Sequence, residues 1–415
     1  HNAARVLPEK QRIDDRVAEL FVPVILIISL LTFFIWVFFG GIDVVSHGLF
    51  AALSVLVVAC PCAVGLATPV ALAAGLNKAA RNHILIRDTS ALEQMRNVDV
   101  VVFDKTGTLT EGHPTVIGWL WAQGQEEHYK DVLLAAESTS DHPLAEAIVT
   151  ALEGEEQVIP AHLDGFESIA GKGVRVAYQG AEYWVGSHKL LKDYQANLSD
   201  ILADMLTQYE SDGNSIVYFG RENDLLAVIA IKDQLRVTSM EAIRELRIQD
   251  IEICMLTGDG ERTASSVAGS LGIMRFVADA MPDDKEDFIH KLQLQGKTVA
   301  MVGDGVNDAQ ALSCADVSIA MGKGTDTLMD TAMITLRTSD LLLLPKVFRL
   351  SRQTVSLMYR NLFWAFIYNT VGIFVAAGVL YPVYDILLSP ALAGAAMALS
   401  CVSVALSSLR LSSRF

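Results

Sequence analysis

Asp104-Lys105-Thr106-Gly107-Thr108-Leu109-Thr110 follows directly after the apolar run of residues 98–103. This pattern predicts a buried β-strand that delivers a carboxylate into a polar turn containing glycine. In an open parallel sheet, ligands bind beyond the carboxyl ends of the strands, so Asp104 stands where a phosphate and its metal could meet it. A lone Asp in that position often only caps or turns the chain. Whether Asp104 is a nucleophile therefore depends on the other strand ends.

The surrounding region, residues 89–340, alternates apolar strands with amphipathic helices, which is typical of a doubly wound α/β domain. The expected strands span residues 98–103, 251–256, 298–302 and 317–320. Polar loops containing glycine follow three of them, at Asp104, at Thr257-Gly258-Asp259 and at residues 303–308. Because parallel strands end at the same edge of a sheet, we expect one site to collect all three loops.

Residues 113–231 interrupt this alternation and predict an inserted α+β domain, so the α/β domain is expected in two parts, residues 89–112 and 232–340. The expected helices and strands of the insertion span residues 130–137, 143–152, 173–178, 181–185, 215–219 and 225–231. An insertion beside a catalytic loop can present a second substrate-binding surface.

Apolar residues concentrate at the two ends of the chain, and the mean hydropathy of +0.36 is too high for an ordinary soluble protein. The apolar runs span residues 21–39, 49–76, 362–380 and 386–406. Each approaches or exceeds the roughly 20 residues that a bilayer-spanning helix needs. We expect two membrane helices in residues 1–88 and two in residues 341–415, a membrane bundle joined to the α/β region; buried helices of a soluble protein are the alternative.

The charge distribution favours a membrane protein with cytoplasmic termini and a cytoplasmic central region, because the short connections at residues 40–47 and 381–390 lack Lys and Arg. Basic residues flank the apolar runs instead: Arg5, Lys10, Arg12, Arg16, Lys78, Arg81, Arg87, Lys346, Arg349, Arg352, Arg360, Arg410 and Arg414. The first run lacks the position and cleavage site of a signal peptide. The net charge of −16 argues against nucleic-acid binding.

The five cysteines give no disulfide framework, which indicates a protein of a reducing compartment. Cys60 and Cys62 flank Pro61 inside the second apolar run. Residues two apart on an ideal helix point to nearly opposite sides, but a proline displaces the preceding turn and frees backbone carbonyls. Both thiolates could then face one cavity. Two thiolates favour Cu(I), although Zn²⁺ is also compatible.

The three strand-end loops, in this order, resemble those of P-type ATPases, ion pumps whose haloacid-dehalogenase-like domain passes through an aspartyl phosphate. The resemblance implies that Asp104 attacks the γ-phosphate of ATP, and that Asp104, Asp304 and the Thr106 carbonyl hold Mg²⁺. The other catalytic residues that it implies are Lys105, Thr257, Gly258, Asp259, Lys285, Asn307 and Asp308. Thr257 and Gly258 are expected to hold phosphoryl oxygens.

The resemblance extends into the insertion and implies that it is a nucleotide-binding domain. Glu137, His142, Gly171 and Gly173 occupy positions that contact the adenine end of ATP in heavy-metal P-type ATPases. The paired glycines would let the backbone approach the nucleotide closely. A lone His-Pro or Gly-x-Gly is weak evidence, so this prediction depends on their order after the Asp104 loop.

The third and fourth apolar runs carry Tyr368, Asn369, Met397 and Ser400. Any one of these could serve helix packing alone. With Cys60 and Cys62, they resemble the transmembrane ligands of the copper-transporting subgroup. Zinc, cadmium and lead pumps carry a Lys and an Asp in the corresponding helices, and neither run contains one. The resemblance therefore implies Cu(I) as the transported ion and does not separate it from Ag(I).

No Thr-Gly-Glu occurs in the sequence. In the family, that tripeptide lies on an actuator domain that helps to hydrolyse the phosphate, so we expect this domain and the first membrane helices to lie outside these 415 residues. Smaller departures are Gly260, Gln310 and Ser407, where the family commonly has Asn, Pro and Asn. None of them removes a proposed catalytic atom.

The sequence thus predicts ATP-driven Cu(I) export through an aspartyl phosphate on Asp104. The protein is expected in a cell (inner) membrane, with its phosphorylation and nucleotide domains in the cytoplasm. A copper donor, either a chaperone or a small-molecule thiol, is the expected partner. Three alternatives stay open: a zinc- or cadmium-type pump, a membrane-tethered phosphotransferase, and a fragment that cannot complete the cycle.

Overall fold

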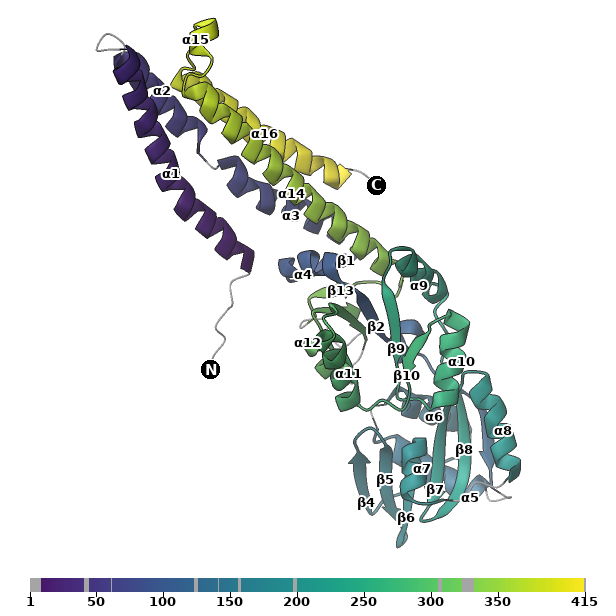
Figure 1. Ribbon diagram of the computed structural model, residues 1–415. Coiled ribbons are helices and arrows are strands. Elements are labelled where there is room, and N and C mark those ends of the chain that lie inside the picture. Colours follow the sequence, from purple (N-terminus) through teal and green to yellow (C-terminus); the bar gives the residue numbers. More distant parts are fainter. Residues whose placement is uncertain are drawn as a thin grey trace. The chain divides into compact units, whose positions relative to one another are not determined.

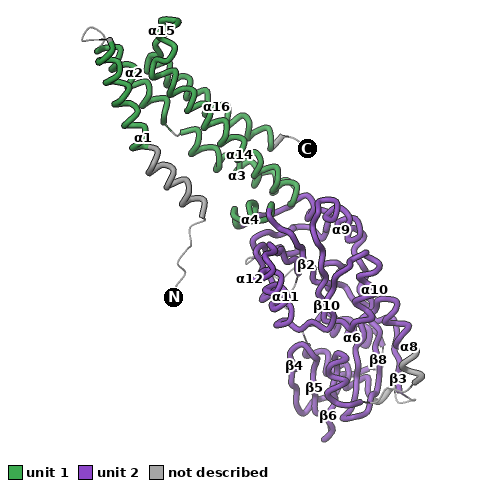
Figure 2. The backbone as a smooth tube through the Cα atoms, viewed as in Figure 1, with its two compact units in different colours: residues 1–82, 88–96, 347–415 green, residues 83–87, 97–346 purple. Residues whose placement is uncertain are grey.

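The structure is a computed structural model. It describes residues 9–40, 45–60, 62–122, 126–140, 142–155, 158–196, 200–304, 308–322 and 332–413. Two compact units form, as Figure 2 shows: unit 1 comprises residues 1–82, 88–96 and 347–415, and unit 2 comprises residues 83–87 and 97–346.

Unit 1 is helical. Its helices are α1 (Glu9–Gly40), α2 (Val45–Val58), α3 (Cys62–Arg81), α4 (Thr89–Gln94), the 3₁₀ turn η2 (Met95–Asn97), α14 (Leu343–Ala376), α15 (Tyr381–Tyr384) and α16 (Pro390–Ser413). Among the described residues, three segments are long and apolar enough to cross a membrane: Val22–Phe39, Val45–Arg81 and Pro390–Leu411. The second of these comprises two helices, α2 and α3, whereas the sequence predicted one helix with a turn displaced by proline.

The expected span at residues 362–380 does not qualify by these criteria, for two reasons. Its helix, α14, ends at Ala376, and the last stretch of membrane length inside it includes the polar residues Arg360, Asn361, Tyr368 and Asn369. The outer side of α14 is nevertheless apolar, with Phe363 59% and Phe374 60% exposed. That this helix crosses the membrane stays a prediction.

Small side chains let the helices of unit 1 approach closely, as is common where helices pack in lipid. Ala63, Ala67 and Ala71 of α3 are fully buried. A Cβ on Gly372 of α14 would lie 2.4 Å from a methyl carbon of Val58 of α2, so a larger residue there would force Val58 to move. Polar contacts add to this packing, since Asn361 Nδ2 donates to Ser408 Oγ at 2.9 Å, between α14 and α16.

Unit 2 contains a seven-stranded sheet in the order β1-β13-β12-β11-β2-β9-β10, parallel except for the β1–β13 pair. Its strands are β1 (Ile84–Ile86), β2 (Val100–Asp104), β9 (Glu252–Leu256), β10 (Arg275–Val277), β11 (Val299–Gly303), β12 (Val317–Met321) and β13 (Ile334–Leu336). Its helices are α9 (Ser239–Ile248), α10 (Glu261–Leu271), α11 (Pro282–Leu294) and α12 (Ala309–Cys314). The central strands β2, β11 and β12 are buried along their whole length, as a parallel sheet covered on both faces requires.

The second sheet of unit 2 is antiparallel, in the order β3-β8-β7-β6-β5-β4. It is formed by β3 (Thr115–Trp121), β4 (Gly165–Ile169), β5 (Gly173–Tyr178), β6 (Ala181–Gly186), β7 (Ser215–Arg221) and β8 (Asp224–Lys232), with α5 (Glu126–Glu137), α6 (Pro143–Glu153), α7 (His188–Asp193) and α8 (Asp200–Ser211) (Figure 1). Helices α5 and α6 share one apolar core with the sheet, while α7 and α8 share another that contains Trp184 and Tyr218. The expected fold class, membrane helices with a doubly wound domain and an α+β insertion, is confirmed.

Candidate functional site

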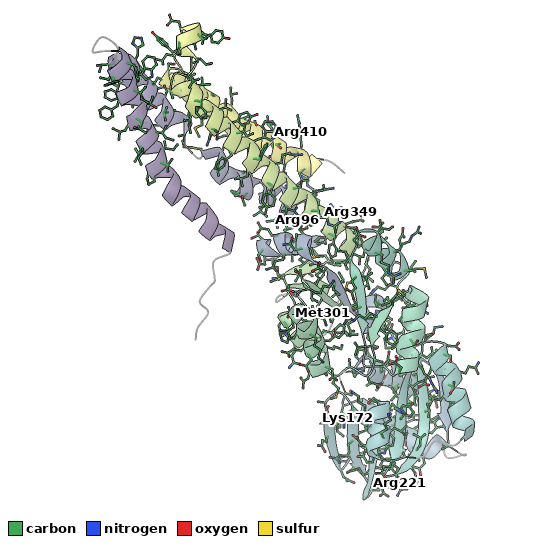
Figure 3. The ribbon with its side chains drawn as sticks, in the orientation of Figure 1. Arg96, Lys172, Arg221, Met301, Arg349 and Arg410 are labelled. Atoms are coloured by element: carbon green, nitrogen blue, oxygen red, sulfur yellow. A yellow bond between two sulfur atoms is a disulfide. The ribbon has the colours of Figure 1, made fainter. Side chains whose placement is uncertain are left out.

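Asp104 ends β2 at the carboxyl edge of the seven-stranded sheet, where β9 and β11 also end. The register places Asp104 beside Leu256 of β9 and Phe103 beside Val302 of β11. Each strand therefore delivers the loop that follows it to the same edge. Figure 3 labels Met301 within β11, two residues before the strand ends at Gly303.

A buried lysine joins two carboxylates at this edge. Lys285 Nζ, near the start of α11, donates to Asp104 Oδ1 at 2.5 Å and to Asp308 Oδ1 at 2.7 Å. All three residues are less than 10% exposed. Burial alone would lower the pKa of Lys285, but Asp104 and Asp308 outweigh it and hold that pKa above its ordinary value. The ammonium therefore stays charged between the two carboxylates.

Asp304 completes an acidic cluster with Asp104 and Asp308, whose oxygens all lie within 4.8 Å of one another. Burial, reinforced by the charge of Asp104, raises the pKa of Asp304 to about 7. The same two causes raise the pKa of Asp308 to about 7, although Lys285 opposes them. One ammonium thus does not balance three clustered carboxylates. Hard oxygen donors with excess negative charge are what Mg²⁺ requires, so the residues fit that ion.

The turn Lys105–Leu109 is tightly constrained. Gly107 has φ +70°, and a Cβ there would lie 1.5 Å from Asp304 Oδ2. Its N–H donates to Thr110 Oγ1 at 3.0 Å, and its carbonyl accepts from the Arg236 guanidinium. Glycine is therefore the residue that lets this turn pass beside the Asp304 carboxylate.

Sequence reasoning missed two residues that hold this turn, Asp233 and Arg236. Arg236 Nε also donates to the Thr108 carbonyl at 2.9 Å, and Asp233 accepts from the Thr110 hydroxyl and from the Gly112 N–H. Both follow β8, the last strand of the inserted domain. An acidic and a basic residue directly after an apolar strand, where the chain returns to the α/β domain, was the signal that could have identified them.

A second charged pair lies beside the first. Lys105 donates to the Asp259 carboxylate and to Ser215 Oγ, the latter at 3.1 Å. Burial alone would raise the pKa of Asp259, but the Lys105 charge outweighs it and lowers that pKa. Thr257 Oγ1 accepts from the Asp259 N–H at 3.1 Å. These contacts hold the Thr257-Gly258-Asp259 loop against the Asp104 loop.

For the other candidate catalytic residues that it describes, the structure gives exposure and backbone conformation but no hydrogen bond to the Asp104 carboxylate. Gly258 is exposed, and Thr106 is half-buried with extended backbone angles of φ −73° and ψ 129°. Asn307 lies outside the described residues, so its position stays a prediction. Gln310, a departure from the family pattern, is exposed on α12.

The four candidate nucleotide-contacting residues lie on the inserted domain. Glu137 ends α5, and burial raises its pKa to about 7. His142 precedes α6, where its Nδ1 accepts from the Leu144 N–H at 3.2 Å. Gly171 and Gly173 flank Lys172, which Figure 3 labels in the turn between β4 and β5. Gly173 has φ +143°, and a Cβ there would lie 2.1 Å from the Val185 carbonyl oxygen.

In unit 1, Cys60 and Cys62 lie on either side of the break between α2 and α3, and their sulfur atoms are bonded to each other. Free thiolates were expected, so the disulfide is a correction to the sequence analysis. The two side chains can meet because α2 ends at Val58 and α3 begins at Cys62, whereas a continuous helix would point them apart. Both sulfurs therefore point to the same side, and reduction would make both available to a soft metal.

The other membrane candidates differ in burial. Asn369 is 6% exposed and Ser400 8% exposed, and Asn369 Nδ2 and Ser400 Oγ are buried without a hydrogen-bond partner among the described residues. Met397 is half-buried, and Tyr368 is 47% exposed. Buried polar atoms without partners are costly in an apolar bundle, which makes Asn369 and Ser400 stronger ligand candidates than Tyr368.

Comparison with known proteins identifies the family to which the chain belongs. Residues 98–316, more than half of the chain, match the family model described as haloacid dehalogenase-like hydrolase. The chain belongs to that family. The matched segment begins just before β2 and includes β9 and β11, so it contains the strands that deliver all three loops.

Individual relatives match nearly the whole chain, including both units. The chain is 43% identical over 401 residues to a copper-exporting P-type ATPase of Legionella pneumophila, covering 97% of this chain and 54% of the relative. It is 44% identical over 406 residues to a silver exporting P-type ATPase of Salmonella typhimurium, covering 97% and 49%. The crystal structure of a zinc-transporting PIB-type ATPase in the E2.Pi state matches with a TM-score of 0.68 and 32% identity, covering 96% of this chain and 63% of that one.

These matches confirm the predicted resemblance to heavy-metal P-type ATPases. The chain spans about half the length of the curated relatives that it matches.

Proposed function

We propose that the chain is the catalytic and transport core of an ATP-driven Cu(I) exporter that is phosphorylated on Asp104. The observation that carries the proposal is the convergence of Asp104, Lys285, Asp308 and Asp304 at one sheet edge. A chain that carries this centre and a paired-cysteine break in an apolar bundle combines the two parts that an ATP-driven metal pump needs. The copper- and silver-exporting relatives support the same conclusion.

In the proposed reaction, an Asp104 carboxylate oxygen attacks the γ-phosphorus of ATP. The new bond joins that oxygen to phosphorus, the bond from phosphorus to the bridging oxygen breaks, and ADP leaves with the electron pair. Lys285 holds Asp104 in place and supplies positive charge where charge builds up on the transferring group. Thr257 and the Gly258 N–H would bind phosphoryl oxygens.

The three clustered carboxylates are the proposed Mg²⁺ site, with Asp104 and Asp304 as principal ligands and the Thr106 carbonyl beside them. When bound, the ion would neutralise the phosphate oxygens and let an anionic nucleophile approach an anionic substrate. Without the ion, burial and the charge of Asp104 raise the pKa values of Asp304 and Asp308 to about 7, so protonation competes with Mg²⁺ near neutral pH. Both must lose these protons to act as ligands.

Glu137, His142, Gly171 and Gly173 are the proposed contacts for the adenine end of ATP. The His142 side chain is exposed at the surface. Desolvation by the surrounding protein atoms nevertheless lowers its pKa, and the charge of Asp259 opposes this shift while that of Lys105 adds to it. A neutral imidazole next to the phosphorylation centre suits stacking on a base. Glu137, whose pKa is raised to about 7 by burial, could accept or donate a hydrogen bond there.

The proposed route for Cu(I) passes the reduced thiolates of Cys60 and Cys62. Asn369, Ser400 and Met397 supply further donors from α14 and α16, and Tyr368 contributes least because it is the most exposed. Cu(I) is favoured over Zn²⁺ because thiolate and thioether donors are soft and the two helices lack an intramembrane carboxylate or amine. The zinc-transporting structural relative keeps Zn²⁺ as the alternative cargo.

We further propose that both termini and unit 2 are cytoplasmic, that a copper donor loads the chain, and that a domain outside these residues hydrolyses the aspartyl phosphate. The basic residues that flank the apolar segments support the orientation. A cell (inner) membrane is the proposed location.

Labelling with γ-³²P-ATP and Mg²⁺ tests the reaction in the full reduced chain. We expect an acid-stable, hydroxylamine-sensitive label on the wild type and none on Asp104→Asn, which has nearly the same shape. Measuring Cu(I) and Zn²⁺ binding by wild type and by the Cys60→Ala, Cys62→Ala double variant tests the cargo. Absence of the label would sink the reaction, and Zn²⁺ binding without Cu(I) binding would overturn the metal.

A further inference from the structure

The described residues contain one more place where three metal-ligating side chains meet. Glu286 and His290 lie one turn apart on α11, and Cys314 ends α12, which packs against α11. One ligand atom of each lies within 4.8 Å of the other two. All three side chains reach the surface, so an ion from solvent has access.

Two of the three separations are close to those of a tetrahedral metal centre, and the third is at most 4.8 Å. Cys314 Sγ lies 3.3 Å from Glu286 Oε1, and His290 Nε2 lies 3.5 Å from the same oxygen. Around a tetrahedral zinc ion with ordinary bond lengths, sulfur and oxygen ligands stand about 3.5 Å apart, and nitrogen and oxygen ligands about 3.4 Å apart. Only small adjustments would therefore bring all three atoms onto one ion.

Gln293 orients two of the three ligands. Its Oε1 lies 3.1 Å from His290 Nδ1, and its Nε2 donates to the Cys314 carbonyl at 2.9 Å. Because a carbonyl oxygen faces Nδ1, that nitrogen carries the proton, and Nε2 keeps its lone pair on the side of Glu286. A hydrogen-bonded Nδ1 with a free Nε2 is the usual arrangement of a metal-ligating histidine.

We propose that Glu286, His290 and Cys314 bind a divalent ion of the zinc class, with a fourth position open to water. A thiolate, an imidazole and a carboxylate together suit Zn²⁺, whereas the carboxylate is a poor ligand for Cu(I). Binding displaces the Cys314 thiol proton, which now points to Glu286, and releases it to solvent. This ion is distinct from the proposed cargo, and the inference holds whether or not the chain exports copper.

The site would fasten together the two helices that carry part of the phosphorylation centre. Lys285 directly precedes Glu286, and Asp308 directly precedes α12. Lys285 already joins Asp308 at 2.7 Å. A metal ion between α11 and Cys314 would join the same two helices a second time, at the other end of α12.

The test uses the full, untagged chain with Cys60→Ser and Cys62→Ser, so that the membrane thiols cannot bind metal, and excess Mg²⁺ to occupy the carboxylate cluster. Zn²⁺ is titrated, and Co²⁺ serves as a spectroscopic substitute. We expect one tight site with a thiolate-to-metal absorption band. His290→Ala and Cys314→Ser should weaken binding at least about 100-fold, and Gln293→Ala about 10- to 100-fold. The matched control, His162→Ala, removes an exposed histidine elsewhere and should leave the affinity unchanged.

Hydrogen exchange supplies a second readout. In the Cys60→Ser, Cys62→Ser protein, Zn²⁺ should slow the exchange of backbone amides in α12, and it should not do so when Cys314→Ser is added. Equal Zn²⁺ affinity in those two proteins, or a Co²⁺ complex without the thiolate band, would overturn the proposal.

Discussion

The two candidate sites differ in how their polar groups are satisfied. At the sheet edge of unit 2, Lys285 joins Asp104 and Asp308, and hydrogen bonds from Arg236 fix the neighbouring turn. In the bundle of unit 1, Asn369 Nδ2 and Ser400 Oγ are buried without partners among the described residues. In the first site Lys285 compensates part of the carboxylate charge, so removing Lys285 should cost stability as well as activity, whereas removing an excess carboxylate charge should not cost stability. In the second site these buried polar atoms have no described partner to lose, so changes there should affect ligand binding more than stability.

The largest expected effect on stability is that of Lys285→Met. Removing the ammonium leaves buried carboxylates uncompensated, which should cost about 3–5 kcal/mol in the free energy of unfolding. The loss should shrink as pH falls from 8 to 5, because Asp304 and Asp308, with pKa values of about 7, take up protons. Pulse proteolysis in Mg²⁺-free buffer measures it. The control, Lys291→Met on the same helix, removes an exposed charge and should change little.

A pH-independent loss, or an equal loss from both variants, would show that charge compensation does not hold this site together.

Gly107→Ala should reduce phosphorylation about 100-fold, since displacing a reacting group by about 1 Å commonly costs that much. Its Cβ would lie 1.5 Å from Asp304 Oδ2, and φ is +70°. Gly260→Ala is the matched control, because nothing lies within 4 Å of a Cβ there and its φ of −64° suits any residue. Initial rates of label incorporation compare the two. Similar rates would contradict the tight packing of the Asp104 turn.

Asp304→Asn should stabilise the metal-free protein while weakening Mg²⁺ binding, so that phosphorylation requires a higher Mg²⁺ concentration. The pKa of Asp304 is raised to about 7, so the unfolded chain releases this proton at lower pH than the folded one. In the wild type, stability contributed by this group is therefore present at low pH and lost as pH rises to about 7. At pH 8 the variant should gain on the order of 2 kcal/mol, since partial exposure screens the full effect.

Thermal unfolding at pH 5 and pH 8, with and without Mg²⁺, measures this gain. A variant less stable than the wild type at pH 8 without Mg²⁺ would show that the cluster is not strained by its charge.

The smallest stability effect is expected in unit 1. Asn369→Ala and Ser400→Ala remove no side-chain hydrogen bond found among the described residues, so each should change stability by less than about 0.5 kcal/mol, yet weaken Cu(I) binding about 10-fold or more. Asn361→Ala, the control on α14, breaks the 2.9 Å bond to Ser408 and should cost about 0.6 kcal/mol without altering Cu(I) affinity. Competition with a coloured Cu(I) chelator reports the affinities. Unchanged affinity in the first two variants would mean that these polar atoms serve packing.

The sequence predicted the long apolar elements of unit 2 better than its short or surface elements. The four strands expected around Asp104 all form, because long apolar runs identify buried parallel strands. Strands β1, β10 and β13 were not expected, since three residues are too few to show a pattern. Helices α7 and α8 were missed for another reason: the strands of the insertion dominate its pattern, whereas these helices are fixed by packing on its second face.

For the sites, the sequence brought together residues that lie within motifs. Asp104, Asp304 and Asp308 follow strands of one sheet, so topology alone predicts that they meet. Arg236 was missed because its role depends on the return of β8 to the Asp104 turn, and the charged residues after this strand are only an indirect sign of that contact. Glu286 and Cys314 were missed because their contact depends on how α11 packs against α12.

The proposed Cu(I) exporter requires that Cu(I) held by Cys60 and Cys62 stimulates phosphorylation of Asp104. The most direct measurement is the amount of hydroxylamine-sensitive phosphoenzyme formed by the reduced full chain from ATP and Mg²⁺, as a function of free Cu(I) or Zn²⁺. Cu(I) should raise it in the wild type and leave the Cys60→Ala, Cys62→Ala variant unchanged, while Zn²⁺ has no such effect. Equal Cu(I) stimulation of both proteins, or stimulation by Zn²⁺ alone, would contradict the proposed Cu(I) exporter.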